Sequence, residues 1–356
     1  MNDRNAGSPG QLESLEAGSR PRVLVVGGGF GPDCMEWHVV ETLRRMGCPT
    51  AFVNTAIRIE RFGATVNGVV DKLAKTLVRE PERWSERSIL ELVSRFAPTL
   101  ILVLQGKVLS PKTVAAIRTR SRATVVCWCQ DQLSVLGRQY LLGAGYDAVF
   151  LKDRYMQDLF SRMIRSTSFF YLPEACNPQV HRPLELSAED HQRYACDVIV
   201  AGSLYYYRQE ILRQLGEFDV RFWGYVPGWI VRRPGFRHMG GDILLDKKVR
   251  AVRAARIALN PLHFAEIDAL NCRAFELAGC GAFQLVTSRP VLREHFEPGV
   301  EVETFDCSDD LIDKIRHYLK HPEAAAAIAR RGQERAHLEH TYEARLGEIF
   351  RICLRP

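Results

Sequence analysis

The sequence predicts an α/β protein with two doubly wound parallel sheets that face each other across a cleft. Short, almost continuously apolar runs alternate with longer helical patterns, as in βαβ units whose strands are buried on both faces. The alternation is interrupted once, near the middle of the chain, by Pro173, Pro178 and Pro183. A chain of 356 residues is also long enough for two such cores.

The first Rossmann-like domain is expected over residues 21–172. Apolar runs that predict strands lie at 22–26, 50–53, 99–103, 124–129, 148–151 and 169–172. Helical patterns between them lie at 36–46, 88–96, 111–118 and 155–165. The preceding residues 1–20 are polar and have no apolar core, so we expect a disordered tail and not a signal peptide.

The second Rossmann-like domain is expected over residues 194–338, after a linker at 173–193 whose prolines disfavour both helix and central strand. Strands are predicted at 197–201, 220–223, 257–260, 282–286 and 301–305. Helices are predicted at 208–218, 243–255, 271–278, 309–318 and 323–338. The closing segment 339–356 carries an apolar stripe at helical spacing, and we expect it to pack back toward the first domain.

Composition narrows the class of protein. Lys and Arg number 48 against 42 Asp and Glu, an excess of +6 that is weak for a nucleic-acid binder but compatible with a phosphorylated substrate. The ten cysteines form no zinc-type pair, and several lie in apolar runs, which favours a reducing compartment. No apolar run is long enough to span a membrane. We therefore expect a cytoplasmic protein without a zinc-type cysteine site or nucleic-acid partner, with at most peripheral membrane contact.

The strongest candidate site lies in the segment 271–281. Asn271 is a good helix N-cap, and Arg273 and Glu276 share one face of the helix that follows. A helix N-terminus with an arginine attracts a diphosphate, and a carboxylate one turn later can accept both hydroxyls of a ribose. On spacing alone, a surface helix with an ordinary Arg–Glu pair explains the same residues.

Other candidates follow predicted strands of the second domain. Gly202 and Ser203 stand between a strand and a helix, where backbone N–H groups can approach a phosphate, and Arg208 is placed to neutralise it. A plain tight turn with a surface arginine is the alternative. Gly224 ends the next strand and is expected to shape a pocket for a base. The basic segment 232–256 is expected to be mostly a solvated face.

In the first domain, the glycines at 27–31 fail the Gly-x-Gly-x-x-Gly spacing in both registers, which argues against a nicotinamide-dependent oxidoreductase. We expect Gly29 to line the cleft instead. Asp131 follows the strand at 124–129 and is the candidate for an acceptor-side or catalytic carboxylate, for example a general base. A helix N-cap is the alternative role of Asp131. Lys107 also closes a strand and is a weaker candidate.

The segment 271–281 resembles the signature of the CgeB-type spore-maturation proteins, a glycosyltransferase-like family. The resemblance lies in Asn271, Arg273, Phe275, Glu276 and the small-residue run 279–281. Residues 197–203 with Arg208, the linker at 172–183 and the closing segment at 340–345 resemble further parts of that family. The resemblance covers most of the chain beyond about residue 95.

The resemblance implies a GT-B fold and a metal-independent, hexosyltransferase-like enzyme. Its donor would be a nucleotide-sugar such as a UDP-, dTDP- or GDP-sugar, without a further cofactor, and its acceptor an unidentified small molecule, glycan or protein. Retaining GT-B enzymes mark the donor site with two acids eight positions apart. The second, which binds ribose, maps to Glu276, and the first to Asp268, with Glu266 as a rival.

Donor binding is assigned to a set of residues in the second domain and one glycine in the first: Gly202, Ser203, Arg208, Gly224, Asn271, Arg273, Glu276 and Gly29. Asp131 and Asp268 are the candidate catalytic acids. The alternative function is a catalytically inactive nucleotide-binding or surface-assembly protein that shares the GT-B fold. The presence of Asp268 where Glu is usual keeps that alternative open.

Overall fold

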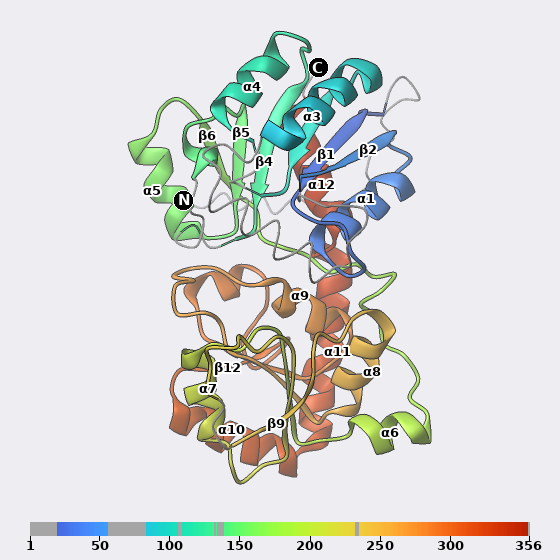
Figure 1. Cartoon of the computed structure of the whole chain (residues 1–356). Coiled ribbons are helices and arrows are strands. Elements are labelled where there is room, and N and C mark those ends of the chain that lie inside the picture. Colours follow the sequence, from blue (N-terminus) through green and yellow to red (C-terminus); the bar gives the residue numbers. More distant parts are fainter. Residues whose placement is uncertain are drawn as a thin grey trace, which may run out of the picture.

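The computed structural model of the chain describes residues 20–55, 83–105, 109–131, 133, 139–231 and 235–354. Two lobes, each built on one sheet, lie one above the other (Figure 1). The predicted tail, apart from Arg20, and Lys107 lie outside the described residues.

The N-terminal lobe is built on a six-stranded parallel sheet with the order β2-β1-β3-β4-β5-β6. Its strands are β1 (Val23–Gly27), β2 (Thr50–Asn54), β3 (Leu100–Val103), β4 (Thr124–Cys129), β5 (Ala148–Leu151) and β6 (Ser168–Tyr171). Its helices are α1 (Met35–Arg45), α3 (Arg83–Phe96), α4 (Pro111–Arg118), the short η2 (Tyr140–Leu142) and α5 (Arg154–Met163). All residues of β1, β3 and β5 are buried, as expected of strands covered on both faces.

The C-terminal lobe is built on a second six-stranded parallel sheet, with the order β12-β11-β10-β7-β8-β9. Its strands are β7 (Val198–Ala201), β8 (Val220–Trp223), β9 (Arg237–Gly240), β10 (Ile257–Asn260), β11 (Gln284–Thr287) and β12 (Glu303–Phe305). Its helices are α7 (Tyr206–Arg213), α8 (Leu245–Ala254), α9 (Cys272–Gly279), η3 (Pro290–Glu294), α10 (Ser308–Lys320) and α11 (Pro322–Glu339). The sequence did not predict β9, because this exposed edge strand carries no apolar pattern.

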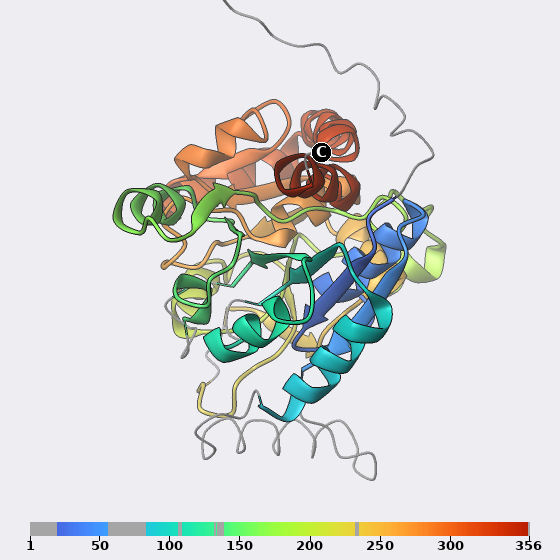
Figure 2. The ribbon, with the colours of Figure 1, turned by 90° about the horizontal axis from the view of Figure 1, so that it is seen from above.

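Two segments connect the lobes. The first, over the predicted linker, ends in a helix that was not expected, α6 (Ala188–Tyr194). A capping box between Ser187 and Asp190 starts α6 once the prolines are past. The second leads into α12 (Tyr342–Cys353), whose Leu346 and Ile349 join the core of the N-terminal sheet, and Figure 2 shows α12 in dark red beside that lobe.

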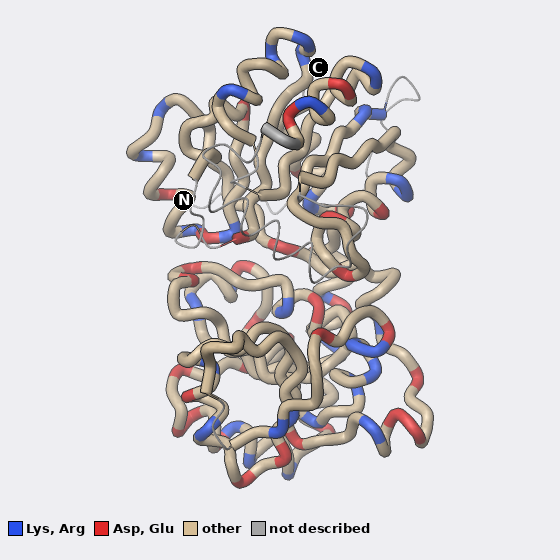
Figure 3. Tube along the Cα trace, in the orientation of Figure 1, with Lys and Arg blue, Asp and Glu red and all other residues tan. Residues whose placement is uncertain are grey.

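The two connections lie side by side. The Cys176 N–H donates to the carbonyl of His340 (2.8 Å), and the Tyr342 N–H donates to the carbonyl of Cys176 (3.1 Å). Lys, Arg, Asp and Glu positions of both lobes lie along the backbone where the lobes meet (Figure 3). One example is Lys152, which follows β5 and forms an ion pair with Glu266, which follows β10. The carboxyl ends of the strands in both sheets therefore point toward one junction, which is where ligands bind in such sheets.

Candidate functional site

Two glycine turns at the carboxyl ends of β7 and β8 form the base of the site in the C-terminal lobe. Gly202 and Gly224 both have positive φ, 122° and 146°. The Gly202 N–H donates to the carbonyl of Trp223 (2.9 Å), and a Cβ on Gly224 would overlap the carbonyl oxygen of Gly202. Only glycine fits both positions, because both have positive φ. The close approach of Gly224 to the Gly202 carbonyl fixes the position of the Gly202 turn.

Two guanidinium groups converge on the Gly202 turn. A Cβ on Gly202 would lie 2.9 Å from Nη1 of Arg273 and 3.3 Å from Nη1 of Arg208. Arg208, from α7, is 2% exposed and donates hydrogen bonds to the carbonyls of Ser203 and Pro261. Arg273, from α9, is half-buried. The three residues predicted from separate motifs, Gly202, Arg208 and Arg273, therefore meet in space.

Both arginines keep their charge at neutral pH. Burial, and then the neighbouring Arg273, lowers the pKa of Arg208 to about 10. Burial alone would also lower the pKa of Arg273, but the fields of Cys272, Glu276 and Glu266 raise it above its ordinary value. Within the described ranges, no carboxylate lies at ion-pair distance from either arginine, and their Nε atoms are buried without a hydrogen-bond partner. The arrangement has the charge and the open donors of an anion site.

Asn271 starts α9 as predicted, and its side chain is fully engaged in doing so. Its Oδ1 accepts the Ala274 N–H (3.2 Å), and its amide exchanges two hydrogen bonds of 3.0 Å with Asn260, the last residue of β10. Asn271 therefore fixes the start of α9 relative to the sheet, which sets the direction of Arg273.

Glu276 lies one turn further along α9 and faces the junction of the lobes. Its Oε2 lies 3.0 Å from Nζ of Lys248, and its Oε1 lies 3.9 Å from Nε2 of His181. Burial would raise the pKa of Glu276, but the charge of Lys248 outweighs burial and lowers it. Lys248 is itself buried, so the expectation of a solvated basic face is wrong at this position.

Asp268, the predicted first acid, is turned away from the arginines. Its Oδ1 accepts the N–H of Val291 (2.8 Å), and burial raises its pKa. Glu266 instead lies in the junction, with Oε1 2.7 Å from Nζ of Lys152. The loop takes this direction because the Asp268 carbonyl accepts the N–H of Arg154 from the other lobe (2.9 Å). The geometry favours the rival Glu266 as the acid near the arginines, while the catalytic role of Asp268 stays a prediction.

Lys152 holds a second carboxylate besides Glu266. Its Nζ lies 3.5 Å from Oε1 of Glu174, which follows β6 in the first connection. Burial raises the pKa of Glu174 to about 7, against the opposing charge of Lys152. No sequence pattern links Lys152, Glu174 and Glu266, because they come from three separate segments.

The N-terminal lobe contributes a glycine loop and two acids. A Cβ on Gly28 would lie 2.9 Å from Nε2 of Gln105, whereas nothing lies within 4 Å of a Cβ on Gly29. A side chain at position 28 would thus displace the end of the Gln105 side chain, and the role of Gly29 stays a prediction. Glu36, at the start of α1, is buried behind the loop, and burial raises its pKa. Asp131 is exposed just past β4, and its field adds to the raised pKa of Glu36. The acceptor-side or catalytic role of Asp131 stays a prediction.

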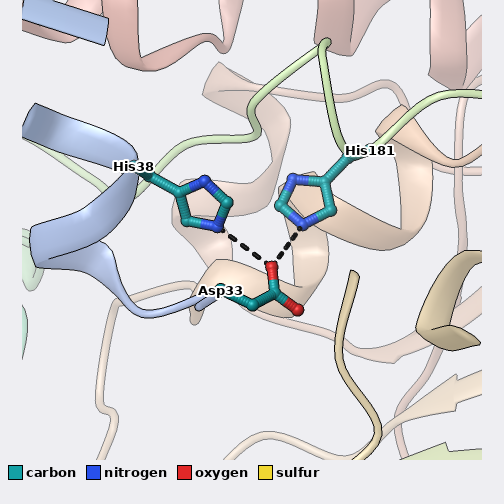
Figure 4. A group of neighbouring side chains, drawn as sticks. All are labelled: Asp33, His38 and His181. Atoms are coloured by element: carbon teal, nitrogen blue, oxygen red, sulfur yellow. Dashed lines mark hydrogen bonds and ion pairs between the residues drawn. The ribbon is translucent and has the colours of Figure 1, made fainter. Parts of the chain in front are cut away.

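Asp33, His38 and His181 form a compact group at the same junction (Figure 4), with possible metal-ligating atoms within 4.8 Å of one another. Nδ1 of His181 accepts the backbone N–H of Asn177 (3.0 Å), and Nδ1 of His38 faces Nδ2 of Asn177 (3.1 Å). Both Nε2 atoms therefore carry the protons. Nε2 of His38 donates to Oδ1 of Asp33 at 3.0 Å, and Nε2 of His181 lies 3.4 Å from the same oxygen. A metal would need the Nε2 lone pairs, so this group is a hydrogen-bonded network.

A family model matches part of the chain, and solved structures match the fold over almost the whole chain. Residues 208–351 match the sequence family described as glycosyl transferase-like. A search of curated protein sequences gave no match. None of the helices in the described part of the chain is both long and apolar enough to cross a membrane.

Solved structures resemble the chain over almost its whole length. Sucrose-phosphate synthase from Thermosynechococcus elongatus has a TM-score of 0.66 at 12% identity, covering 93% of this chain and 98% of its own. A glycosyltransferase from Rickettsia africae has a TM-score of 0.64 at 11% identity, covering 94% and 98%. Anabaena HepE in complex with UDP-glucose has a TM-score of 0.64 at 13% identity, covering 94% and 99%. The chain therefore has the GT-B fold, and its residues 208–351 are similar to a glycosyltransferase-like domain.

Proposed function

We propose that the chain is a glycosyltransferase and that the diphosphate of its nucleotide-sugar donor lies between Arg208 and Arg273. The supporting observation is the convergence of these two arginines on the Gly202 turn, with no paired carboxylate in the described ranges. Buried charge without a counter-ion is unfavourable in a folded protein, and an anionic ligand supplies the missing partner. Without a Cβ at Gly202, phosphate oxygens can reach both guanidinium groups.

In the proposed reaction, the bond between the anomeric carbon and the diphosphate oxygen breaks, and a bond from that carbon to an acceptor oxygen forms. The two arginines stabilise the charge that develops on the leaving diphosphate. Glu276 accepts hydrogen bonds from the ribose. The acceptor lies against the N-terminal lobe, where Asp131 or the buried Glu36 takes the proton that the acceptor loses.

The protein is further proposed to be of the CgeB type, to transfer a hexose without a metal ion, and to act in the cytoplasm. The residues 271–281 support the first, and the two arginines support the second because they can neutralise a diphosphate without a cation. HepE, which shares the fold, has been crystallised with UDP-glucose and with UDP. A UDP-hexose is therefore the first donor to test.

The test is isothermal titration calorimetry of the protein with UDP, GDP and dTDP, followed by donor-hydrolysis and transfer assays with the corresponding sugar nucleotides. We expect Arg273→Gln to weaken nucleoside-diphosphate binding by about 10- to 100-fold, because a hydrogen bond to a charged group contributes about 1.5–3 kcal/mol. Arg331→Gln is the control, since Arg331 is half-buried like Arg273 but lies on α11, where it donates to the carbonyl of Val300.

Equal binding by Arg273→Gln and the parent protein would show that the diphosphate site is wrongly placed. Tight binding of a nucleoside diphosphate without hydrolysis or transfer of any sugar would favour the alternative, a nucleotide-binding protein that has lost catalysis.

A further inference from the structure

Asp33 makes an unusual contact across the junction of the lobes. It belongs to the loop between β1 and α1, yet its fully buried carboxylate bonds α8 of the other lobe. Oδ2 lies 2.8 Å from Nζ of Lys248 and accepts the N–H of Leu245, the first residue of α8, at 3.0 Å. Asp33 therefore caps a helix of the C-terminal lobe from the N-terminal lobe, and an anion is favourable at that end of a helix.

The backbone on both sides of this contact is strained. Asp33 has a φ of 68° and Leu245 a φ of 52°, and only one other non-glycine residue of the described chain has a positive φ. Such conformations cost free energy and persist where the surroundings enforce them, commonly at functional sites. Two of them meet here, at one hydrogen bond between the lobes.

Lys248 transmits the contact to the proposed donor site. It lies in the first turn of α8, where the helix dipole disfavours a cation, and it is stabilised there by carboxylates from both lobes. One is Asp33, and the other is Oε2 of Glu276 at 3.0 Å. The second oxygen of Glu276, Oε1, accepts no hydrogen bond from the described residues and has His181 as its neighbour at 3.9 Å.

We propose that Asp33 is a positioning residue of the donor site, contributed by the N-terminal lobe. Through Lys248 it holds Glu276 with one oxygen engaged and the other turned to the ribose of the donor. This inference rests on the proposed function, and it adds that the ribose and the diphosphate are recognised by separate parts of the site. Ribose recognition depends on the contact between the lobes, whereas diphosphate recognition by Arg208 and Arg273 does not.

The experiment compares UDP with inorganic pyrophosphate, which has the phosphates but no ribose. Dissociation constants of both are measured by calorimetry for the parent, Asp33→Asn and Lys248→Arg. Asp33→Asn weakens the hold on Lys248, and Lys248→Arg keeps the charge but alters its geometry. We expect each variant to bind UDP about ten-fold more weakly than the parent and to bind pyrophosphate equally well. Lys248→Arg also serves if Asp33→Asn does not fold.

The matched control is Arg154→Gln. Arg154 of α5 forms an ion pair with Glu294 of η3, so it also joins the two lobes. Neither residue of this pair contacts Glu276 or Lys248. We expect parent-like affinity for both ligands. If Asp33→Asn and Lys248→Arg bind UDP like the parent, or lose UDP and pyrophosphate to the same extent, the positioning role is overturned. If the parent binds neither UDP, GDP nor pyrophosphate, the proposed function fails, and this inference fails with it.

Discussion

Two charged clusters at the junction of the lobes differ in how their charges are balanced. At the Gly202 turn, Arg208 and Arg273 lie together without a carboxylate at ion-pair distance in the described chain. Around Asp33, by contrast, Lys248 contacts two carboxylates, at 2.8 Å and 3.0 Å, and the Nε2 atoms of His38 and His181 lie 3.0 Å and 3.4 Å from the first of them. We call these the arginine cluster and the Asp33 cluster.

The difference indicates that the arginine cluster binds a ligand and that the Asp33 cluster joins the two lobes. The arginine cluster has donors that no described residue uses, so its charge is available to a ligand. The hydrogen bonds of the Asp33 cluster are almost all satisfied within the protein, so its charge is used to join the lobes. Charge in itself does not distinguish the two roles. The completeness of the internal pairing does.

The largest expected effect follows from replacing the cation of the Asp33 cluster. Lys248→Met leaves the carboxylates of Asp33 and Glu276 buried without their shared partner. We expect the free energy of unfolding to fall by about 3–5 kcal/mol, as for other broken buried pairs. Arg273→Met, in the arginine cluster, should change it by about 1 kcal/mol or less while abolishing diphosphate binding. Urea denaturation without ligand measures both.

An equal loss of stability in the two variants would contradict the comparison. It would mean that Arg273 is balanced by its neighbours as completely as Lys248 is, and that the arginine cluster is structural. The exposed ion pair between Arg154 and Glu294 gives the baseline, since such pairs contribute about 1 kcal/mol or less.

The next effect concerns the backbone on which the arginine cluster is built. A Cβ in Gly224→Ala would overlap the carbonyl oxygen of Gly202 and would also sit at a φ of 146°. We expect a loss of about 3 kcal/mol in the free energy of unfolding from strain and overpacking. The Gly202 turn must also shift, so diphosphate affinity should fall. Gly228→Ala, where nothing lies within 4 Å of the Cβ, is the control.

A Gly224→Ala variant with parent-like stability and parent-like diphosphate affinity would show that the turn adapts. Gly202 would then not be fixed by its neighbour, and the convergence of the two arginines on it would lose its structural basis.

Local sequence signals predicted most of the fold and half of the site. Neighbouring residues indicate the buried strands and the cap of α9, and also Gly202, Arg208 and Arg273, because each follows or starts a recognisable element. The Asp33 cluster could not be found in this way. Its members come from a loop, a linker and three helices, and only the packing of the two lobes brings them together. The same limit explains Asp268, whose spacing from Glu276 was correct but whose direction depends on Arg154 of the other lobe.

The smallest expected effect uses acid to ask which groups hold the junction. Burial lowers the pKa of His181, and lowers the pKa of His295 to about 2 and of His340 to about 3. Since an unfolded histidine has a pKa of about 6.5, the unfolded state binds more protons than the folded state below that pH, and stability falls as the pH is lowered.

The pKa values of Asp33 and Glu276 are below their ordinary range, because the hydrogen bonds of Asp33 and the charge of Lys248 outweigh burial. Their contribution is therefore present above about pH 4 and is retained at pH 5.

Between pH 7 and pH 5, His295 and His340 should thus each cost about 2 kcal/mol of stability, and the two carboxylates nothing. His340→Gln removes one of these histidines without touching the Asp33 cluster, so the parent should lose about 2 kcal/mol more than the variant over that range. Glu174, whose pKa is raised to about 7 by burial, titrates in both proteins and cancels in the difference. Urea denaturation of parent and variant at the two pH values gives the result. An equal loss in both would place the acid sensitivity in the carboxylates, and the Asp33 cluster would then be the part of the junction that acid opens first.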